Sequence, residues 1–453
     1  MGGVVTAPVC RDAVIVIPGI MGSELVDAET GDVLWGLSPR SYLRFWTSGG
    51  GLERLQVTDQ EREGKTGRIR AKGLLRFPVA SPIFGGFEPY TRLVAAIRHS
   101  LVHSDALCEF AYDWRLPVAF NAARLGDAVE AHLRRWRMHR MGSKDASVVL
   151  VAHSMGGLVA RCFTGTTDGA PAVRQTVTLG TPFFGAVKAA YLLNAGRGAP
   201  VPLPRARLRE LALTLPGVHD LLPSYRCVDD AGGRPLTPAD VADLGGDGEL
   251  ADASFAMQRT LAKLGTDGLR TVVGVEQPTM QSMRLVRGVV VPQRHLVEEG
   301  VRTDHRGDGT VYVEAALGGV EPVSYLPQSH AGLARAPEAI AAVVAVLTRQ
   351  RLGPPMGATG AGLDAPDLAI VGEPCEVRIT APDDAVPSCR VVDADTGEQV
   401  AAPVPVRRDG QLLVTMRMSA PGVYRVEVKT GGYSAVTALI MALPPGGAHD
   451  GSR

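Results

Sequence analysis

Short, continuous apolar runs alternate with longer amphipathic stretches over the first 350 residues of this 453-residue chain. Runs without alternating polar positions are typical of parallel strands that are covered on both faces. Between the runs, apolar residues recur at helical spacing, for example from Leu125 to Trp136, and Asn121 stands where it could cap that helix. The alternation predicts an α/β fold. The predicted strands are AVIVI (13–17), ALCEFA (106–111), VVLVA (148–152), TVTLG (176–180) and TVVGV (271–275).

Two insertions interrupt the alternation. Segment 36–87 mixes glycines with aromatic residues, and segment 190–265 is rich in proline, leucine and aspartate with weak helical periodicity. Both segments are predicted to form a cap or lid over a site. The aromatic residues of the first insertion include Tyr42, Phe45, Trp46, Phe84 and Phe87.

The composition changes near residue 350. Residues 350–365 are rich in glycine and proline and predict a linker, whereas residues 366–445 contain five strand-like runs with turn signals between them. We therefore expect an α/β domain over 1–349, a small immunoglobulin-like β-sandwich over 366–445, and a disordered tail over 446–453. No residue cluster in the predicted sandwich indicates chemistry. Its predicted strands are CEVRIT (375–380), SCRVVDAD (388–395), LLVTMRMS (412–419), GVYRVEVKT (422–430) and AVTALIMAL (435–443).

The charge and cysteine content exclude several classes of protein. Lys+Arg and Asp+Glu are balanced at 47 each, so the net charge gives no indication of nucleic-acid binding. The six cysteines are scattered, which predicts buried thiols rather than a disulfide framework or a zinc site. The N-terminal stretch lacks the pattern of a secretory signal, and no apolar run reaches the roughly 20 residues that span a bilayer. We expect a cytoplasmic protein that contacts membranes only peripherally and needs no metal or cofactor.

The run VVLVAHSMGGLVARCF (148–163) raises the central chemical question, because its apolar character breaks at a serine. A strand that turns tightly into a helix lifts one side chain above the carboxyl edge of a sheet, and Ser154 stands at that point. The motif is G-x-S-x-G with Ala152 in place of the first glycine and Gly156 as the second. It predicts a nucleophile, and the alternative is that Ser154 only caps the following helix.

A serine nucleophile needs a base that is oriented by a carboxylate, and on this fold the order along the chain is serine, acid, histidine. Asp308 stands between two glycines in GDGTV (307–311), with Asp304 as the competing carboxylate. His330 lies between a short strand and the last helix of the α/β pattern, where the base is expected. His153 is expected to line the pocket or to support the turn.

Ester chemistry also requires hydrogen-bond donors for the oxyanion. One is normally the backbone N–H of the residue after the nucleophile, here Met155. The second comes from an early strand-to-loop turn, which VIPGIMGSEL (16–25) provides at Gly19 and Ile20. A simple Pro-Gly turn is the alternative for this segment.

Taken together, these motifs resemble the lecithin:cholesterol acyltransferase family, which includes lysosomal phospholipase A2-type enzymes. The likeness covers roughly residues 12–349. The motifs that carry it, in family order, are VIPGIMGSEL, FAYDWR (110–115), AHSMGG (152–157), TLGTPFFGA (178–186), LPGVHDLLPS (215–224), GDGTV and the late His330.

The resemblance implies an α/β-hydrolase fold with Ser154 as nucleophile, Asp308 as orienting acid and His330 as base. It implies that the N–H groups of Ile20 and Met155 form the oxyanion hole. In FAYDWR it implies Trp114 as a wall of the acyl pocket and a salt bridge between Asp113 and Arg115, and in TLGTPFFGA it places Phe183 and Phe184 beside the acyl chain.

The expected function is a serine-dependent lipid acyl-ester hydrolase or O-acyltransferase of the phospholipase A type, acting through an acyl-serine intermediate. Two alternatives are a soluble-ester or polyester hydrolase and an inactive scaffold that has kept the fold. We expect a phospholipid substrate and no nucleic acid. The C-terminal sandwich is expected to dock a protein partner or to restrain the enzyme.

Overall fold

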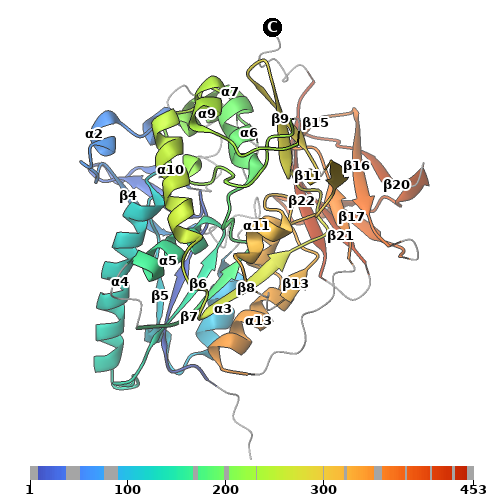
Figure 1. Ribbon diagram of the computed structural model, residues 1–453. Helices are drawn as coiled ribbons and strands as arrows, with labels where there is room; N and C mark the ends of the chain where they lie inside the picture. Colours follow the sequence, from blue (N-terminus) through green and yellow to red (C-terminus); the bar gives the residue numbers. More distant parts are fainter. Residues whose placement is uncertain are drawn as a thin grey trace, which may run out of the picture.

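A wholly parallel, six-stranded sheet forms the centre of the computed structural model (Figure 1). All five predicted strands of the α/β pattern belong to it, which confirms the α/β prediction. Its strands, from edge to edge, are β13 (Ser324–Leu326), β8 (Leu269–Gly274), β7 (Val173–Leu179), β6 (Val148–His153), β1 (Ala13–Ile17) and β5 (Leu107–Glu109). The structure describes residues 9–36, 51–75, 90–166, 172–197, 204–230, 232–298, 300–320, 324–350, 360–382, 385–408, 411–430 and 434–445.

Helices pack on the sheet in two groups (Figure 1). Helices α4 (Val118–Met138) and α5 (Met155–Thr166) contact each other, as do α3 (Thr91–Ser100) and α13 (Pro337–Leu347). Right-handed crossovers place the two groups on opposite faces of a parallel sheet. The predicted apolar stripe of α4 from Leu125 to Trp136 is buried.

The prediction that Asn121 caps helix α4 is wrong. The helix begins at Val118 with Pro117 at the N-cap position, so Asn121 lies inside the first turns. Its side-chain amide donates to the carbonyl oxygens of Asp113 at 2.9 Å and Leu116 at 3.3 Å. Asn121 therefore ties the preceding loop to the helix instead of starting it.

The first insertion contributes one strand to a small antiparallel sheet, and the second insertion contains helices. The five aromatic residues named above for the first insertion lie outside the described residues. The small sheet pairs β3 (Val33–Trp35), β2 (Ser23–Asp27) and β4 (Ile69–Leu74), of which β4 belongs to the insertion. Before β4, the insertion also forms η1 (Glu53–Leu55) and α2 (Asp59–Arg62). The helices are α6 (Val187–Ala195), α7 (Arg205–Leu213), α8 (Pro216–His219), α9 (Pro238–Asp243) and α10 (Gly248–Leu261).

Between β8 and the late helices the chain forms short elements around the carboxyl edge of the main sheet. Two antiparallel pairs are followed by a short helix, by strand β13 and by a one-turn helix that begins at His330. These elements are β9 (Ser282–Val286), β10 (Val289–Gln293), β11 (Leu296–Glu298), β12 (Val301–Thr303), α11 (Val313–Leu317) and α12 (His330–Leu333).

The C-terminal part of the chain folds into two β-sheets, as predicted for a sandwich, with their own buried apolar core. We call residues 362–443 the C-terminal sheets. All five predicted strands are present. One sheet has the order β14 (Gly362–Asp364), β16 (Pro374–Thr380), β20 (Gln411–Arg417), β19 (Val406–Arg408), and the other β15 (Leu368–Ile370), β22 (Val436–Leu443), β21 (Gly422–Lys429), β17 (Ser388–Asp393), β18 (Gln399–Ala401).

The C-terminal sheets contact the α/β part through buried and half-buried hydrogen bonds. The side-chain amide of Gln328 donates to the backbone oxygen of Ser434 at 3.0 Å, and the Glu338 carboxylate accepts from the Ser434 N–H at 3.0 Å. The side-chain amide of Gln277 donates to the Ala361 carbonyl oxygen at 2.9 Å. Gln328 precedes His330 by two residues, so the sheets are anchored next to a predicted site residue.

Two further expectations concern the whole chain. None of the six cysteines forms a disulfide, and five of them are buried, in agreement with the prediction of reduced thiols. Among the described residues, no helix combines the length and the hydrophobicity needed to cross a membrane.

Candidate active site

The turn between β6 and α5 carries Ser154. Strand β6 ends at His153 and helix α5 begins at Met155, so one residue makes the whole turn. Ser154 has a φ of 53°, in the left-handed region that a residue with a side chain occupies at a cost of about 1–3 kcal/mol. Its N–H donates to the Leu179 carbonyl oxygen at 3.0 Å, which holds the strained turn against strand β7. The strain lifts the hydroxyl above the carboxyl edge of the sheet.

Glycines allow the loop after β1 to touch this turn. A Cβ on Gly19 would lie 2.8 Å from the Ser154 Cβ. A Cβ on Gly156 would lie 2.3 Å from the carbonyl oxygen of Pro18 and 2.8 Å from that of Ile17. The small residues of the two motifs therefore serve one purpose, because they bring the backbone around Ile20 against the serine.

We expect Gly156→Ala to lower kcat/KM for any ester by about 10- to 100-fold, because the backbone of the β1 loop must move away from Ser154. The measurement is hydrolysis of p-nitrophenyl butyrate together with the melting temperature. Gly265→Ala is the matched control, since an added Cβ there meets no heavy atom within 4 Å. Equal kcat/KM for the two variants would contradict the expectation.

Ser154, His330 and Asp308 form a continuous hydrogen-bonded chain. His330 Nε2 lies 2.7 Å from Ser154 Oγ, and His330 Nδ1 lies 2.7 Å from Asp308 Oδ2. Because a carboxylate can only accept, Nδ1 carries the proton and Nε2 is left to accept from the serine hydroxyl. The His330 N–H also donates to the Asp308 carbonyl oxygen at 2.8 Å, so backbone and side chain fix the same pair.

Asp308 is buried and rigidly held. Its Oδ1 accepts the N–H groups of Thr310 at 2.9 Å and Val311 at 2.7 Å, which leaves Oδ2 for His330. Gly180 and Gly274 make room for it: a Cβ on Gly274 would lie 2.4 Å from the Asp308 Cβ. The fold thus distinguishes two carboxylates that the sequence left open, since Asp304 is exposed and hydrogen-bonds to Gln281 instead.

His153 links the β1 loop to the segment of His330. Its Nε2 donates to the His330 carbonyl oxygen at 3.0 Å, and its Nδ1 accepts from the Tyr90 hydroxyl at 3.0 Å. The same hydroxyl accepts the Gly19 N–H at 2.9 Å. Burial, together with the neighbouring His330, lowers the pKa of His153 to about 3, so the ring is neutral at physiological pH. Tyr90 was not predicted, and no local pattern marks it.

The two predicted oxyanion donors lie on either side of Ser154. Ile20 lines the same pocket as Ser154 and His330, and Met155 follows the serine directly as the first residue of α5. Their N–H groups as oxyanion donors remain a prediction, which the tight approach of Gly19 to Ser154 favours.

The predicted acyl-binding aromatics lie elsewhere. Trp114 is fully buried, packs edge-on against Trp35 with ring centroids 5.4 Å apart, and donates to the Ser23 carbonyl oxygen. Phe183 packs against Gly318, and Phe184 joins a separate apolar cluster beside Tyr312. None of the three lines the pocket at Ser154. Two other residues of TLGTPFFGA, Pro182 and Ala186, do line this pocket.

The predicted salt bridge of FAYDWR is confirmed, and it has a third member. Arg115 binds Asp113 with two nitrogens, at 3.0 and 2.7 Å, and Glu61 of the first insertion at 2.8 Å. Burial raises the pKa of Glu61, but hydrogen bonds from Arg115, the Thr58 N–H and Arg68 outweigh it and bring that pKa down to about 2. This cluster fixes the first insertion to the loop before α4.

The pocket at Ser154 has a volume of about 330 Å³ and two kinds of wall. One wall is apolar and comes from helix α6 and its neighbours, with Ala189, Leu192 and Leu221. The other carries Lys188, Arg335 and, from the C-terminal sheets, Arg425. The sequence of these sheets contains no residue cluster that indicates chemistry, but the sheets form part of the pocket surface.

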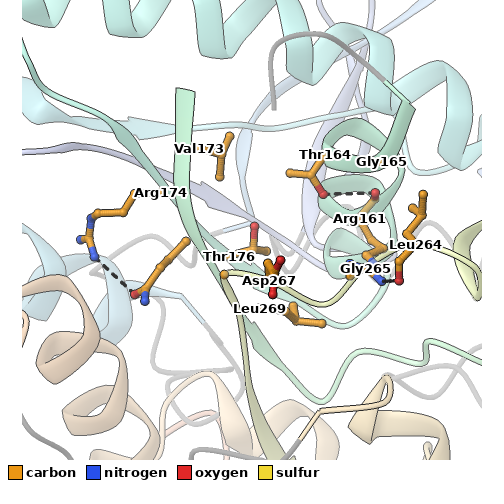
Figure 2. Close-up of a pocket in the computed structure, with 12 residues that line it drawn as sticks. Arg161, Thr164, Gly165, Val173, Arg174, Thr176, Leu264, Gly265, Asp267 and Leu269 are labelled. Atoms are coloured by element: carbon orange, nitrogen blue, oxygen red, sulfur yellow. Dashed lines mark hydrogen bonds between the residues drawn. The ribbon is translucent and has the colours of Figure 1, made fainter. Parts of the chain in front are cut away.

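Two other features lie away from Ser154. A hollow of about 270 Å³ opens where β7 and β8 begin, at the opposite edge of the sheet, and Arg161 there donates to the carbonyl oxygens of Gly265 and Leu264 (Figure 2). In the described part of the chain, one group of three possible metal ligands occurs: His103, Asp105 and His139. The Nδ1 atoms of both histidines accept backbone N–H groups, which places the ring proton on Nε2 and disfavours metal binding there.

Comparison with known proteins supports the resemblance that the sequence motifs indicated. The family model described as lecithin:cholesterol acyltransferase matches residues 83–237. A search of curated proteins gives no significant match. A chain from the structure titled "The crystal structure of Tle4-Tli4 complex" superposes with a TM-score of 0.52 at 17% identity, covering 76% of this chain and 99% of that one. The Bacillus licheniformis lipase BlEst2 in its propeptide form gives a TM-score of 0.37 at 11% identity, covering 96% and 95%.

The first of these structures shares the fold, an α/β-hydrolase, and at this identity it shows the fold alone. The family match includes the turn with Ser154 and supports a lipid ester hydrolase or acyltransferase in general terms. Over residues 83–237 the chain thus matches the lecithin:cholesterol acyltransferase family, as its motifs predicted.

Proposed function

We propose that this protein is a serine-dependent lipid acyl-ester hydrolase or O-acyltransferase of the phospholipase A type. The observation that carries the proposal is the hydrogen-bonded chain from Ser154 through His330 to Asp308, with both hydrogen bonds at 2.7 Å, on a strained turn that opens into a pocket. A serine that only capped a helix would need neither a histidine at this distance nor a buried carboxylate behind it.

In the first step, the Ser154 Oγ attacks the ester carbonyl carbon while His330 Nε2 takes the hydroxyl proton. Asp308 stabilises the resulting imidazolium and keeps its orientation. The carbonyl oxygen becomes an oxyanion, which the N–H groups of Ile20 and Met155 stabilise. When this intermediate collapses, the bond to the leaving alcohol breaks, the alcohol oxygen takes the proton from His330, and an acyl-serine remains.

In the second step, His330 removes a proton from an incoming hydroxyl, and that oxygen attacks the acyl-serine. Water releases a fatty acid, whereas a lipid alcohol gives a new ester. In both cases the proton returns from His330 to the Ser154 oxygen. The same residues serve both outcomes, so the choice of acceptor rests on which hydroxyl the pocket admits.

The family match and the pocket at Ser154 support the proposed lipid substrate. The pocket's apolar wall suits an acyl chain, and its cationic wall suits an acidic group on the same molecule. We infer a cytoplasmic enzyme that meets its phospholipid substrate through peripheral contact with a membrane. A protein partner at the C-terminal sheets stays a prediction.

The test is mass spectrometry of the lipids released from mixed phospholipid liposomes. Wild type is expected to give fatty acid and lysophospholipid, and the Ser154→Ala variant neither. Ser388→Ala, which changes an exposed serine of the C-terminal sheets, is the matched control and should behave as wild type. Acylated alcohols among the products would add the transferase branch.

Two outcomes would replace the proposal with its alternatives. Ser154-dependent cleavage of short-chain nitrophenyl esters, with no gain in rate at a lipid surface, would favour a soluble-ester or polyester hydrolase. Equal product levels from wild type and Ser154→Ala with every ester would favour a scaffold without activity.

A further inference from the structure

The C-terminal sheets close one side of the pocket at Ser154. Arg425 of β21 and Leu439 of β22 are directly paired in the antiparallel register, so they project from the same face of their sheet, and both line the pocket. Asp367, which precedes β15, lines it as well. These residues lie outside residues 83–237, the segment that matches the lecithin:cholesterol acyltransferase family model.

The guanidinium group of Arg425 uses only one of its nitrogens in a hydrogen bond within the described residues. Its Nε donates to Glu427 Oε1 at 2.6 Å, while Glu427 Oε2 is bound by Arg390 at 2.5 and 3.0 Å. One carboxylate is thus shared by two guanidinium groups. Within the described residues, the two terminal nitrogens of Arg425 have no hydrogen-bond partner, and its side chain is 16% exposed. A guanidinium group presents such nitrogens as a planar fork that matches the oxygens of a phosphate.

Two cations of the α/β part face the same space. Lys188, the second residue of α6, donates to the Thr310 hydroxyl at 3.3 Å. Arg335, five residues after His330, hydrogen-bonds to the Thr437 hydroxyl of β22. Burial lowers the pKa of Lys188, and the carboxylates of Asp367 and Asp308 partly counteract this effect. Asp367 is the opposing carboxylate on this wall.

We infer that Arg425, Lys188 and Arg335 form a binding subsite for the phosphate group of a glycerophospholipid, and that the C-terminal sheets complete this subsite. The inference rests on the proposed function, because it assigns the part of the substrate that does not react. It gives the C-terminal sheets a direct role in substrate recognition.

The position of the three cations fits this ligand. Thr310, the partner of Lys188, also donates its N–H to Asp308, so the subsite begins at the loop that holds the triad acid. In a glycerophospholipid only the glycerol carbons separate the ester groups from the phosphate. With the ester at Ser154, the acyl chain lies along the apolar wall of α6, and the phosphate lies toward β21 and β22. The buried surroundings strengthen the contact between a guanidinium group and a phosphodiester.

The experiment compares two matched arginine variants, Arg425→Gln and Arg390→Gln. Both remove one partner of Glu427, but Arg390 does not line the pocket. The substrates are dioleoyl phosphatidylcholine and dioleoylglycerol in the same neutral detergent micelles. Phosphatidylcholine carries no net charge, so attraction of the protein to a charged surface plays no part. The ratio of kcat/KM for phosphatidylcholine to that for dioleoylglycerol is expected to fall by about 10- to 100-fold in Arg425→Gln and to stay at the wild-type value in Arg390→Gln.

A second readout separates this inference from the proposed function. The Ser154→Ala protein, alone and combined with each arginine variant, is titrated calorimetrically with a short-chain dialkyl-ether phosphatidylcholine, which cannot be hydrolysed. Arg425→Gln is expected to weaken binding by about tenfold or more. If wild type cleaves both lipids and neither the ratio nor this affinity depends on Arg425, the subsite is refuted and the hydrolase stands.

If wild type cleaves neither lipid but the ether lipid binds in an Arg425-dependent way, the subsite stands and the proposed activity fails. Inorganic phosphate serves as competitor in the same titration. Displacement of the ether lipid by millimolar phosphate, with the same dependence on Arg425, would support a phosphate site. Tight binding of phosphate with no affinity for the ether lipid would overturn the assignment to a lipid headgroup.

Discussion

His330→Ala is expected to lower kcat by on the order of 10⁴- to 10⁶-fold, and adding Ser154→Ala to it is expected to cost almost nothing more. The reason is that Ser154 and His330 act as one unit: the hydroxyl is a nucleophile only while Nε2, 2.7 Å away, accepts its proton. Once either member is absent, the other has no step to perform. The measurement is kcat for wild type, both single variants and the double variant on one ester substrate.

The control for this cycle is His305→Ala. His305 is closer than His330 to Asp308 in the sequence, but its Nε2 lies 3.4 Å from Glu298 on the short strand β11, away from the serine. Its removal should leave kcat unchanged. Additive losses, in which the double variant falls by the product of the two single factors, would show that Ser154 and His330 act independently and would refute the proposed triad.

The central sheet and the three triad residues could be predicted from the sequence because each depends on a local pattern. Continuous apolar runs mark buried parallel strands, and a parallel sheet brings the carboxyl ends of all its strands to one edge. Ser154 follows β6 and His330 follows β13, both strands of this sheet, so their proximity follows from chain order, whereas Asp308 follows the short antiparallel strand β12 and was indicated by its position between two glycines. The glycines beside them supplied the remaining signal.

The residues that the sequence did not indicate depend on long-range packing. Tyr90 and Gly19 form a hydrogen bond although they are 71 residues apart in the sequence, and Glu61 and Arg115 do so at a separation of 54 residues. Arg425 comes from sheets with a separate core, and its role depends on how they dock on Gln328 and Glu338. No spacing or composition marks these pairs. Trp114 shows the converse, because the family resemblance placed it in the acyl pocket while the structure packs it against Trp35.

Arg115→Met is expected to lower the free energy of unfolding by about 3–5 kcal/mol, the largest effect on stability that we predict. Arg115 is fully buried between Glu61 and Asp113, whose side chains are 2% and 10% exposed. Its removal leaves the carboxylates of Glu61 and Asp113 in a site with little water. It also breaks the contact that holds the first insertion to the loop before α4. The measurement is urea unfolding at pH 7, supported by the melting temperature.

The matched control is Arg68→Met. Arg68 also binds Glu61, at 2.9 Å, but its side chain is 37% exposed, and a pair of this kind contributes about 1 kcal/mol or less. A triple variant, Glu61→Gln, Asp113→Asn and Arg115→Met, should recover part of the stability, because no unpaired charge is left. A loss in Arg115→Met no larger than in Arg68→Met would contradict the expectation.

The free energy of unfolding of wild type and that of Arg115→Met are expected to change in opposite directions as the pH falls. In wild type the pKa of Glu61, about 2, lies below its value of about 4.3 in an unfolded chain, so Glu61 stabilises the fold above pH 4 and this stabilisation is lost as the pH falls toward 2. Burial already raises the pKa of Asp113 in wild type, and without Arg115 this pKa rises further, while Glu61 keeps only its hydrogen bonds from Arg68 and Thr58. Protonation then removes the cost of a buried, unpaired negative charge. The variant should therefore gain stability as the pH falls from 7 toward 4. The difference between wild type and Arg115→Met should therefore narrow over that interval, whereas a difference that widens would show that burial of the carboxylates is not its cause.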